Sequence, residues 1–149
     1  MRFMRTLILV TLPLLCLSIY SRAQNKVLDS LEKSYQLCLD KGEHKYQCAL
    51  QYYTQLNLLL DSTYRQICNS MDSSGVRHLR MDQEAWLEKK DVFFKKMDER
   101  VEKLSKKTMD GLDDEMISTD NKAAYIKERL LELLSSKAFA NIKTEEQEQ

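Results

Sequence analysis

The sequence predicts an all-α protein, an antiparallel helical hairpin or bundle of about four helices with one disulfide. Only three glycines and one proline occur in 149 residues, fewer than the turns of a sheet protein of this size require. Charged residues make up 31% of the chain and alternate in sign over short windows, as they do on solvated helix faces. Apolar residues recur at steps of three and four, which is the period of an amphipathic helix.

The first 23 residues have the pattern of a cleaved signal peptide. Arg2 and Arg5 precede the apolar run 7–19, and Ser21-Arg22-Ala23 supplies the small residues of a cleavage site. We therefore expect a mature chain that begins at about Gln24, is periplasmic or secreted, and has no permanent membrane anchor. A lipoprotein, with its lipid on the cysteine of this segment, and an uncleaved anchor are the two alternatives.

Two helices are predicted in the first half of the mature chain. Residues 24–39 form the first, which ends at Asp40-Lys41-Gly42 because glycine readily takes the left-handed conformation that closes a helix. The second extends over about residues 43–69, where apolar side chains repeat at helical spacing. The clearest break in the chain follows it, at residues 70–75, SMDSSG.

The third helix, predicted over residues 76–109, has one face of mixed character. Four side chains recur on it at steps of three and four: Leu79, Gln83, Trp86 and Lys90. An indole, an amide and an ammonium on one side need a partner surface that satisfies polar groups and also covers a ring. We expect that partner to be the preceding helix, residues 47–68.

The C-terminal part begins with an acidic segment. Residues 110–120, DGLDDEMISTD, hold five acids and no base, and we interpret them as a connector in which Ser118, Thr119 or Asp120 caps a last helix. That helix is predicted over residues 122–140, and the polar tail that follows is expected to fray. The chain then divides into a signal peptide, a helical domain, and a connector with the last helix and tail: residues 1–23, 24–110 and 111–149.

The cysteines allow one disulfide within the mature chain. Signal-peptide cleavage leaves Cys38, Cys48 and Cys68, an odd number, so in an oxidising compartment one thiol is free or bonds to another molecule. Cys38 and Cys48 flank the turn at Gly42, where a helical hairpin brings them within reach. Cys48 and Cys68 would lie about 30 Å apart on one helix, too far to pair. We therefore predict a Cys38–Cys48 disulfide. Cys68 is expected to be a buried small apolar residue or, alternatively, to link a homodimer.

Two cysteines and three short motifs follow one another in a fixed order. They are Cys38, Cys48, Leu60-Asp61-x-x-Tyr64, Leu79-x-x-x-Gln83-x-x-Trp86 and Lys90-Asp91. Together they resemble the LprI-like domain of small secreted bacterial proteins, which takes its name from a lysozyme inhibitor. Two positions depart from that family's usual pattern: Lys90 replaces an arginine, which removes a bidentate contact, and Phe94 replaces a later cysteine.

The motif residues are expected to be structural first, with an interface role as the alternative. Trp86 is expected to anchor the hairpin, and Tyr64 to pack against it across the two long helices. Gln83 and Asp91 are expected to satisfy polar groups at that junction.

The resemblance implies a helical protein that binds a protein partner outside the cytoplasm, with lysozyme as the suggested target. The protein would block this target by covering its active site with one of three segments: the turn at residues 40–45, the turn at residues 70–75 or the acidic segment 110–120. The competing hypothesis is a non-enzymatic envelope interaction or scaffold module of unknown partner, which self-associates through residues 97–109 and 122–134.

Other classes of function are disfavoured by the composition. The mature chain has 20 basic and 23 acidic residues, a net charge of −3, which argues against nucleic acid as a partner. His44 and His78 lack metal-ligand spacing, and the chain has no phosphate loop or serine elbow. We therefore expect no enzyme activity, no catalytic or metal-binding residues and no cofactor.

Overall fold

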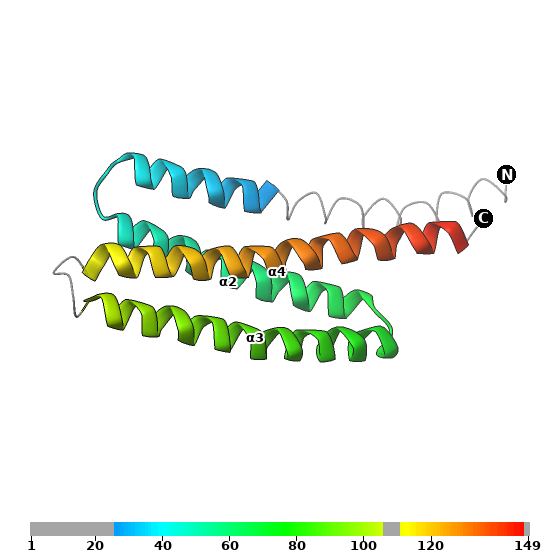
Figure 1. Cartoon of the computed structure of the whole chain (residues 1–149). Coiled ribbons are helices and arrows are strands. Elements are labelled where there is room, and N and C mark those ends of the chain that lie inside the picture. The colour runs from blue at the N-terminus through cyan, green and yellow to red at the C-terminus, as the bar shows by residue number, and fades with distance from the viewer. Residues whose placement is uncertain (1–25, 106–110, 148–149) are drawn as a thin grey trace.

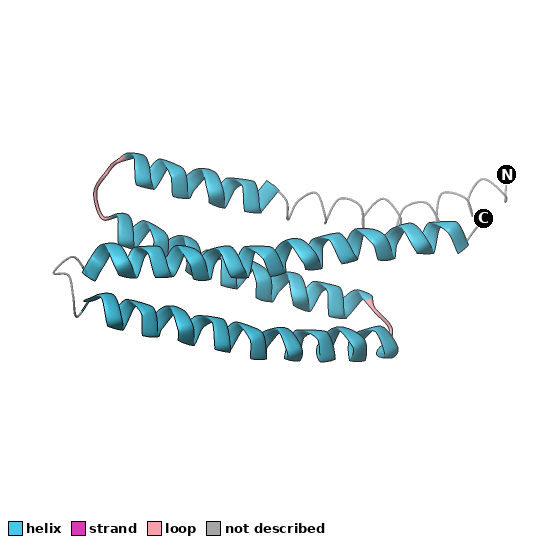
Figure 2. Ribbon diagram, in the orientation of Figure 1, coloured by secondary structure: helices cyan, strands magenta, loops and turns pink. Residues whose placement is uncertain are grey.

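The described part of the chain is helical apart from two short turns. The computed structural model describes residues 26–105 and 111–147, and no strand lies within these ranges (Figure 2). The all-α prediction is confirmed. The predicted signal peptide, residues 1–23, lies outside the described residues. Within them, no helix has an apolar stretch long enough to cross a bilayer.

The described helices run up and down along one another (Figure 1). An N-terminal helix covers residues 26–40 and is followed by α2 (Lys45–Ser70), α3 (Ser73–Ser105) and α4 (Gly111–Gln147). The break predicted at residues 70–75 is shorter than expected. Asp72 accepts a hydrogen bond from the backbone N–H of Gly75 at 2.7 Å, which caps α3 and lets it begin at Ser73.

The acidic connector predicted at residues 110–120 is wrong, because α4 begins at Gly111. Asp113 and Asp114 lie in its first turn, where carboxylates interact favourably with the N-terminal end of the helix dipole. The predicted caps therefore lie inside the helix, and Thr119 donates to the Glu115 carbonyl at 2.8 Å. At the other end the backbone is helical as far as Gln147, so residues 144–147 of the tail predicted to fray continue α4.

The hydrophobic core lies mainly between α2 and α4. Leu56, Leu60 and Ile67 of α2 are buried against Ile126 and Leu130 of α4, as their spacing of three and four residues on each helix requires. Part of the expected self-association surface, residues 122–134, is thereby buried within the chain. Leu28 of the N-terminal helix joins the same cluster. α3 packs chiefly on α4 and touches α2 little, so α4 contacts both other long helices.

A disulfide joins the N-terminal helix to α2, as predicted. It links Cys38 and Cys48, whose Cα atoms are 5.9 Å apart. The turn between them contains Gly42, with φ of 74°, and the N–H of Gly42 donates to the Leu39 carbonyl at 2.9 Å. This is the left-handed helix end that the sequence indicates. His44 also has a positive φ, of 53°, just before α2 begins.

Candidate functional site

The motif residues on α2 differ in how deeply they are buried. Leu60 is part of the buried core, whereas Asp61 is exposed. Tyr64 is half-buried beside Cys68 and Arg80; burial and a hydrogen bond with Cys68 raise its pKa, which Arg80 lowers in part. Cys68 is half-buried and, among the described cysteines, is the one outside the disulfide.

The mixed face of α3 packs on α4 rather than on α2. The ring of Trp86 stacks on that of Tyr125, with centroids 5.8 Å apart, and Gln83 accepts hydrogen bonds from Arg129. The expectation that the helix at residues 47–68 supplies the partner surface is therefore wrong, as is the expected packing of Tyr64 against Trp86. The kind of partner was predicted correctly, since α4 offers both a ring and donors for an amide.

Arg129 joins α4 to α3 through two of its guanidinium nitrogens, and the third bonds Glu132 on its own helix. Its side chain is only 6% exposed. Nε and Nη2 donate to Gln83 Oε1 at 3.1 and 3.0 Å, Nη2 to Asp82 Oδ2 at 2.5 Å, and Nη1 to Glu132 Oε2 at 3.0 Å. The guanidinium carbon also lies 5.7 Å from the centroid of the Trp86 ring. This geometry fixes the register of α3 on α4, and it uses four of the five N–H donors of Arg129.

Lys90 and Asp91 differ in exposure. The Lys90 ammonium lies 5.9 Å from the Trp86 ring centroid and 5.6 Å from that of Phe94, so it forms cation–π contacts with two rings of its own helix. Asp91 is 75% exposed and 3.4 Å from Lys90. The expected role of Asp91 at a buried junction is therefore wrong. Phe94 makes an aromatic contact with Tyr53 on α2, with ring centroids 6.2 Å apart.

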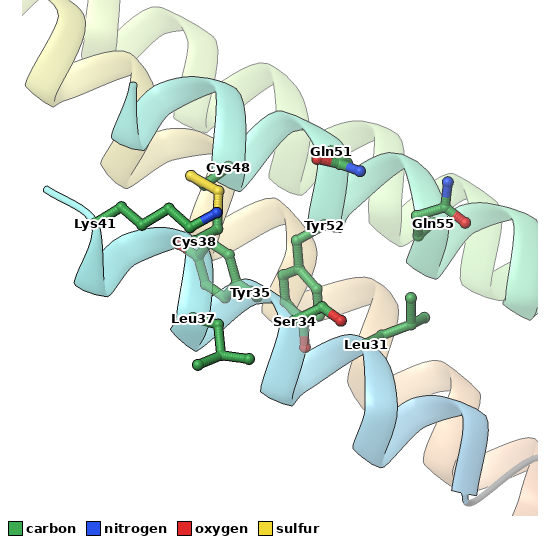
Figure 3. Close-up of a pocket in the computed structure, with 10 residues that line it drawn as sticks. All are labelled: Leu31, Ser34, Tyr35, Leu37, Cys38, Lys41, Cys48, Gln51, Tyr52 and Gln55. Carbon is green, nitrogen blue, oxygen red and sulfur yellow. A yellow bond between two sulfur atoms is a disulfide. The ribbon is translucent and has the colours of Figure 1, made fainter. Parts of the chain in front are cut away.

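A groove of about 330 Å³ lies between the N-terminal helix and α2, next to the disulfide (Figure 3). Tyr35 and Tyr52 stack in it with centroids 4.6 Å apart, and the Tyr35 hydroxyl donates to Asp120 Oδ1 at 2.6 Å. Burial, then the bond to Asp120, raises the pKa of Tyr35 well above its usual value. Burial, then Glu32 and Asp120, raises the pKa of Tyr52 to about 12. The pair thus ties the N-terminal helix to both α2 and α4.

Two segments at one end of the bundle are rich in acidic side chains, and the last turn of α3, which holds Lys103, lies at the same end. The turn at residues 40–45 and the first residues of α4 lie at this end, whereas the α2–α3 turn lies at the opposite end (Figure 1). We call these two segments, residues 40–45 and 113–115, the acidic end. They contain five acids and two lysines: Asp40, Glu43, Asp113, Asp114 and Glu115 with Lys41 and Lys45. Two of the three surfaces proposed from sequence are therefore neighbours.

The described residues contain no group of three or more His, Cys, Asp or Glu that could hold a metal ion. His44 and His78 are both exposed. His44 directly precedes α2, whereas His78 lies in α3. No family profile, curated protein or solved structure matches the chain.

Sequence reasoning missed Tyr125 and Arg129 on α4, and it named Asp120 only as a helix cap, not as the acceptor of the Tyr35 hydroxyl. A signal for the first two is present, because Tyr125 and Arg129 are four residues apart and interrupt the apolar face on which Ile126 and Leu130 lie. A ring and a guanidinium at that spacing are the complement of the Gln83–Trp86 face.

Proposed function

We propose that the protein is a non-enzymatic helical binding protein that acts outside the cytoplasm and docks on a basic protein partner through its acidic end. The observation that carries the proposal is the turn at residues 40–45, which the Cys38–Cys48 disulfide brackets and which lies beside the acidic start of α4. Lysozyme, the target that the LprI-like resemblance suggests, is the first partner to test.

A turn that is held by a disulfide suits binding because it loses little conformational freedom on docking. Association costs free energy for every loop and side chain that it immobilises, and a loop held in its bound conformation avoids much of that cost. Asp40 and Glu43 of this turn are exposed, so a partner can reach them. Their charge, with that of Asp113, would steer a basic protein toward this end.

Inhibition of lysozyme by this end would be steric. The catalytic groups of such an enzyme are themselves two carboxyl groups, so acidic side chains cannot neutralise them. The turn would instead cover the cleft, while its acids contact basic residues around the rim.

The decisive experiment measures turnover of cell-wall substrate by a panel of lysozymes with increasing amounts of the purified, disulfide-intact protein. We expect stoichiometric inhibition that weakens as salt rises, because exposed charges are screened. Combining Asp40→Asn with Glu43→Gln should weaken inhibition about tenfold, at roughly 0.7 kcal/mol per lost contact. The same number of acids neutralised on α3, at Glu84 and Glu88, provides the control. Full turnover at a large molar excess would remove lysozyme as the partner.

The second candidate function is an envelope scaffold that self-associates. It is favoured by large apolar side chains exposed on the outer face of α3: Met81 and Val92, eleven residues and so about three turns apart, are both more than half exposed. Light scattering on the wild type and on Met81→Gln/Val92→Gln tests it. A concentration-dependent dimer that the two substitutions abolish would support the scaffold.

A further inference from the structure

The groove beside the Cys38–Cys48 disulfide is built from two facing helices. Each helix lines it with one face, which extends from Leu31 to Cys38 on the N-terminal helix and from Cys48 to Gln55 on α2. The disulfide and Lys41 lie at one end of the groove, and Leu31 and Gln55 lie at the other (Figure 3). Because the disulfide fixes the spacing of the two helices at its end, the groove is largely formed before a ligand binds, as small-molecule sites usually are.

The polar side chains that line this groove are not bonded to the rest of the described chain. There are four of them, and all are exposed: Ser34, Lys41, Gln51 and Gln55. No hydrogen bond or ion pair among the described residues involves any of the four. A ligand can therefore reach them from solvent, and their donors and acceptors are available to it.

The lining is polar but almost neutral. Among the described residues that line the groove, Lys41 alone is charged, and Asp40 beside it in the chain offsets its charge. The groove therefore does not select an anion. The amides of Gln51 and Gln55 both donate and accept hydrogen bonds, as does the hydroxyl of Ser34. Groups of this kind match a neutral ligand with several hydroxyls, each of which also donates and accepts.

Two aromatic rings give the groove an apolar surface as well. Tyr35 and Tyr52 stack on each other, and both line the groove. A pyranose ring has a face of C–H groups between its hydroxyls, and such a face can pack on the large apolar surface of an aromatic ring. The groove volume of about 330 Å³ lies at the lower end of the range for small-molecule sites, which suits a mono- or disaccharide.

We propose that the groove beside the disulfide is a saccharide-binding site. The amides of Gln51 and Gln55, about one helical turn apart on α2, bond hydroxyls along one edge of the sugar. Ser34 bonds a further hydroxyl from the facing helix. The apolar face of the pyranose lies against the rings of Tyr35 and Tyr52. The site does not require the docking proposed at the acidic end, so it adds a small-molecule ligand to a protein proposed to bind another protein.

The test is an NMR titration of the purified, disulfide-intact protein with the methyl glycosides of glucose, galactose, mannose and N-acetylglucosamine. D-Glucitol, which carries hydroxyls like those of glucose on an open chain without a rigid ring face, is the matched probe. We expect at least one glycoside to cause saturable shifts at the backbone amides of residues 51–55, and glucitol to cause none.

Variants then locate the sugar in the groove. Gln51→Ala and Gln55→Ala should each weaken the affinity for that glycoside about fivefold, the value of one hydrogen bond. Gln36→Ala, at an exposed glutamine of the N-terminal helix outside this lining, is the control and should leave the affinity unchanged. Circular dichroism checks that each variant is folded.

Each of three results would overturn the inference. Equal shifts with glucitol and with a glycoside would show a general effect of hydroxyl compounds rather than a site for a sugar ring. An affinity unchanged in both glutamine variants would place the sugar outside this groove. Shifts that do not saturate with any glycoside of the panel would mean that the groove is not a saccharide site.

Discussion

Substitution of Arg129 by alanine should loosen the contact between α3 and α4. The guanidinium loses contacts of unequal value. Asp82 and Glu132 are each 62% exposed and can return to water, so each pair contributes only about 0–1 kcal/mol. Gln83 is half-buried, and its unpaired oxygen would cost about 1–2 kcal/mol.

Two apolar contributions add to this loss. The contact with the Trp86 ring is worth about 0.5–1 kcal/mol, and the buried stem of Arg129 about 1 kcal/mol. Arg129→Ala should therefore lower the free energy of unfolding by about 4 kcal/mol. Arg129→Lys should lower it by about half as much, since one ammonium cannot make the paired bonds to Gln83 and Asp82.

Urea denaturation, followed by circular dichroism and by the emission of Trp86, measures these effects. The emission should shift to longer wavelength in Arg129→Ala, because the indole loses its cover on the α4 side. Glu132→Gln serves as the control and should change stability by about 0.5 kcal/mol or less. A loss below about 1 kcal/mol in Arg129→Ala, with unchanged emission, would show that Arg129 does not hold the two helices together.

Three further predictions concern the N-terminal helix and its turn. Replacing Cys38 and Cys48 by serine should lower the free energy of unfolding by about 2–3 kcal/mol, measured by urea denaturation; no change would mean that the turn is held without the disulfide. Gly42→Ala should lower the free energy of unfolding by about 1–2 kcal/mol because φ is positive at this position; the added methyl itself meets no atom within 4 Å. Lys41→Ala, the control, should lower it by less than about 0.5 kcal/mol. The pKa of Tyr52 is raised to about 12 from 10.0, so above pH 10 the unfolded chain loses this proton while the folded chain keeps it, and stability falls until about pH 12. Tyr52→Phe should flatten that fall in a series of thermal melts, and an equal fall in both proteins would contradict the assignment.

The sequence was sufficient where the determining interactions are local. Side-chain periodicity located the helices because burial of one face sets it directly. The Cys38–Cys48 disulfide was predictable because Gly42 fixes a turn between two cysteines ten residues apart. The same locality explains the error at residues 110–120. Asp113 and Asp114 are as favourable in the first turn of a helix as in a loop, so composition alone does not distinguish the two.

Partners that are distant in the chain were harder to predict. The spacing of Gln83 and Trp86 defines a face of α3, but periodicity carries no information on which helix covers it. Arg129, which is 46 residues from Gln83, resembles any surface arginine until α4 is placed. The arrangement of candidate surfaces was equally hidden, because it depends on the direction in which each helix runs.

Because α4 contacts both other long helices, the core cannot close before α4 has been synthesised. Leu56 and Leu60 must wait for Ile126 and Leu130, some seventy residues later in the chain, so these contacts have high sequence separation and form late. Until then α2 exposes an apolar stripe that can aggregate or bind a chaperone. A nascent chain arrested before residue 126 should therefore be a substrate for holding chaperones and proteases.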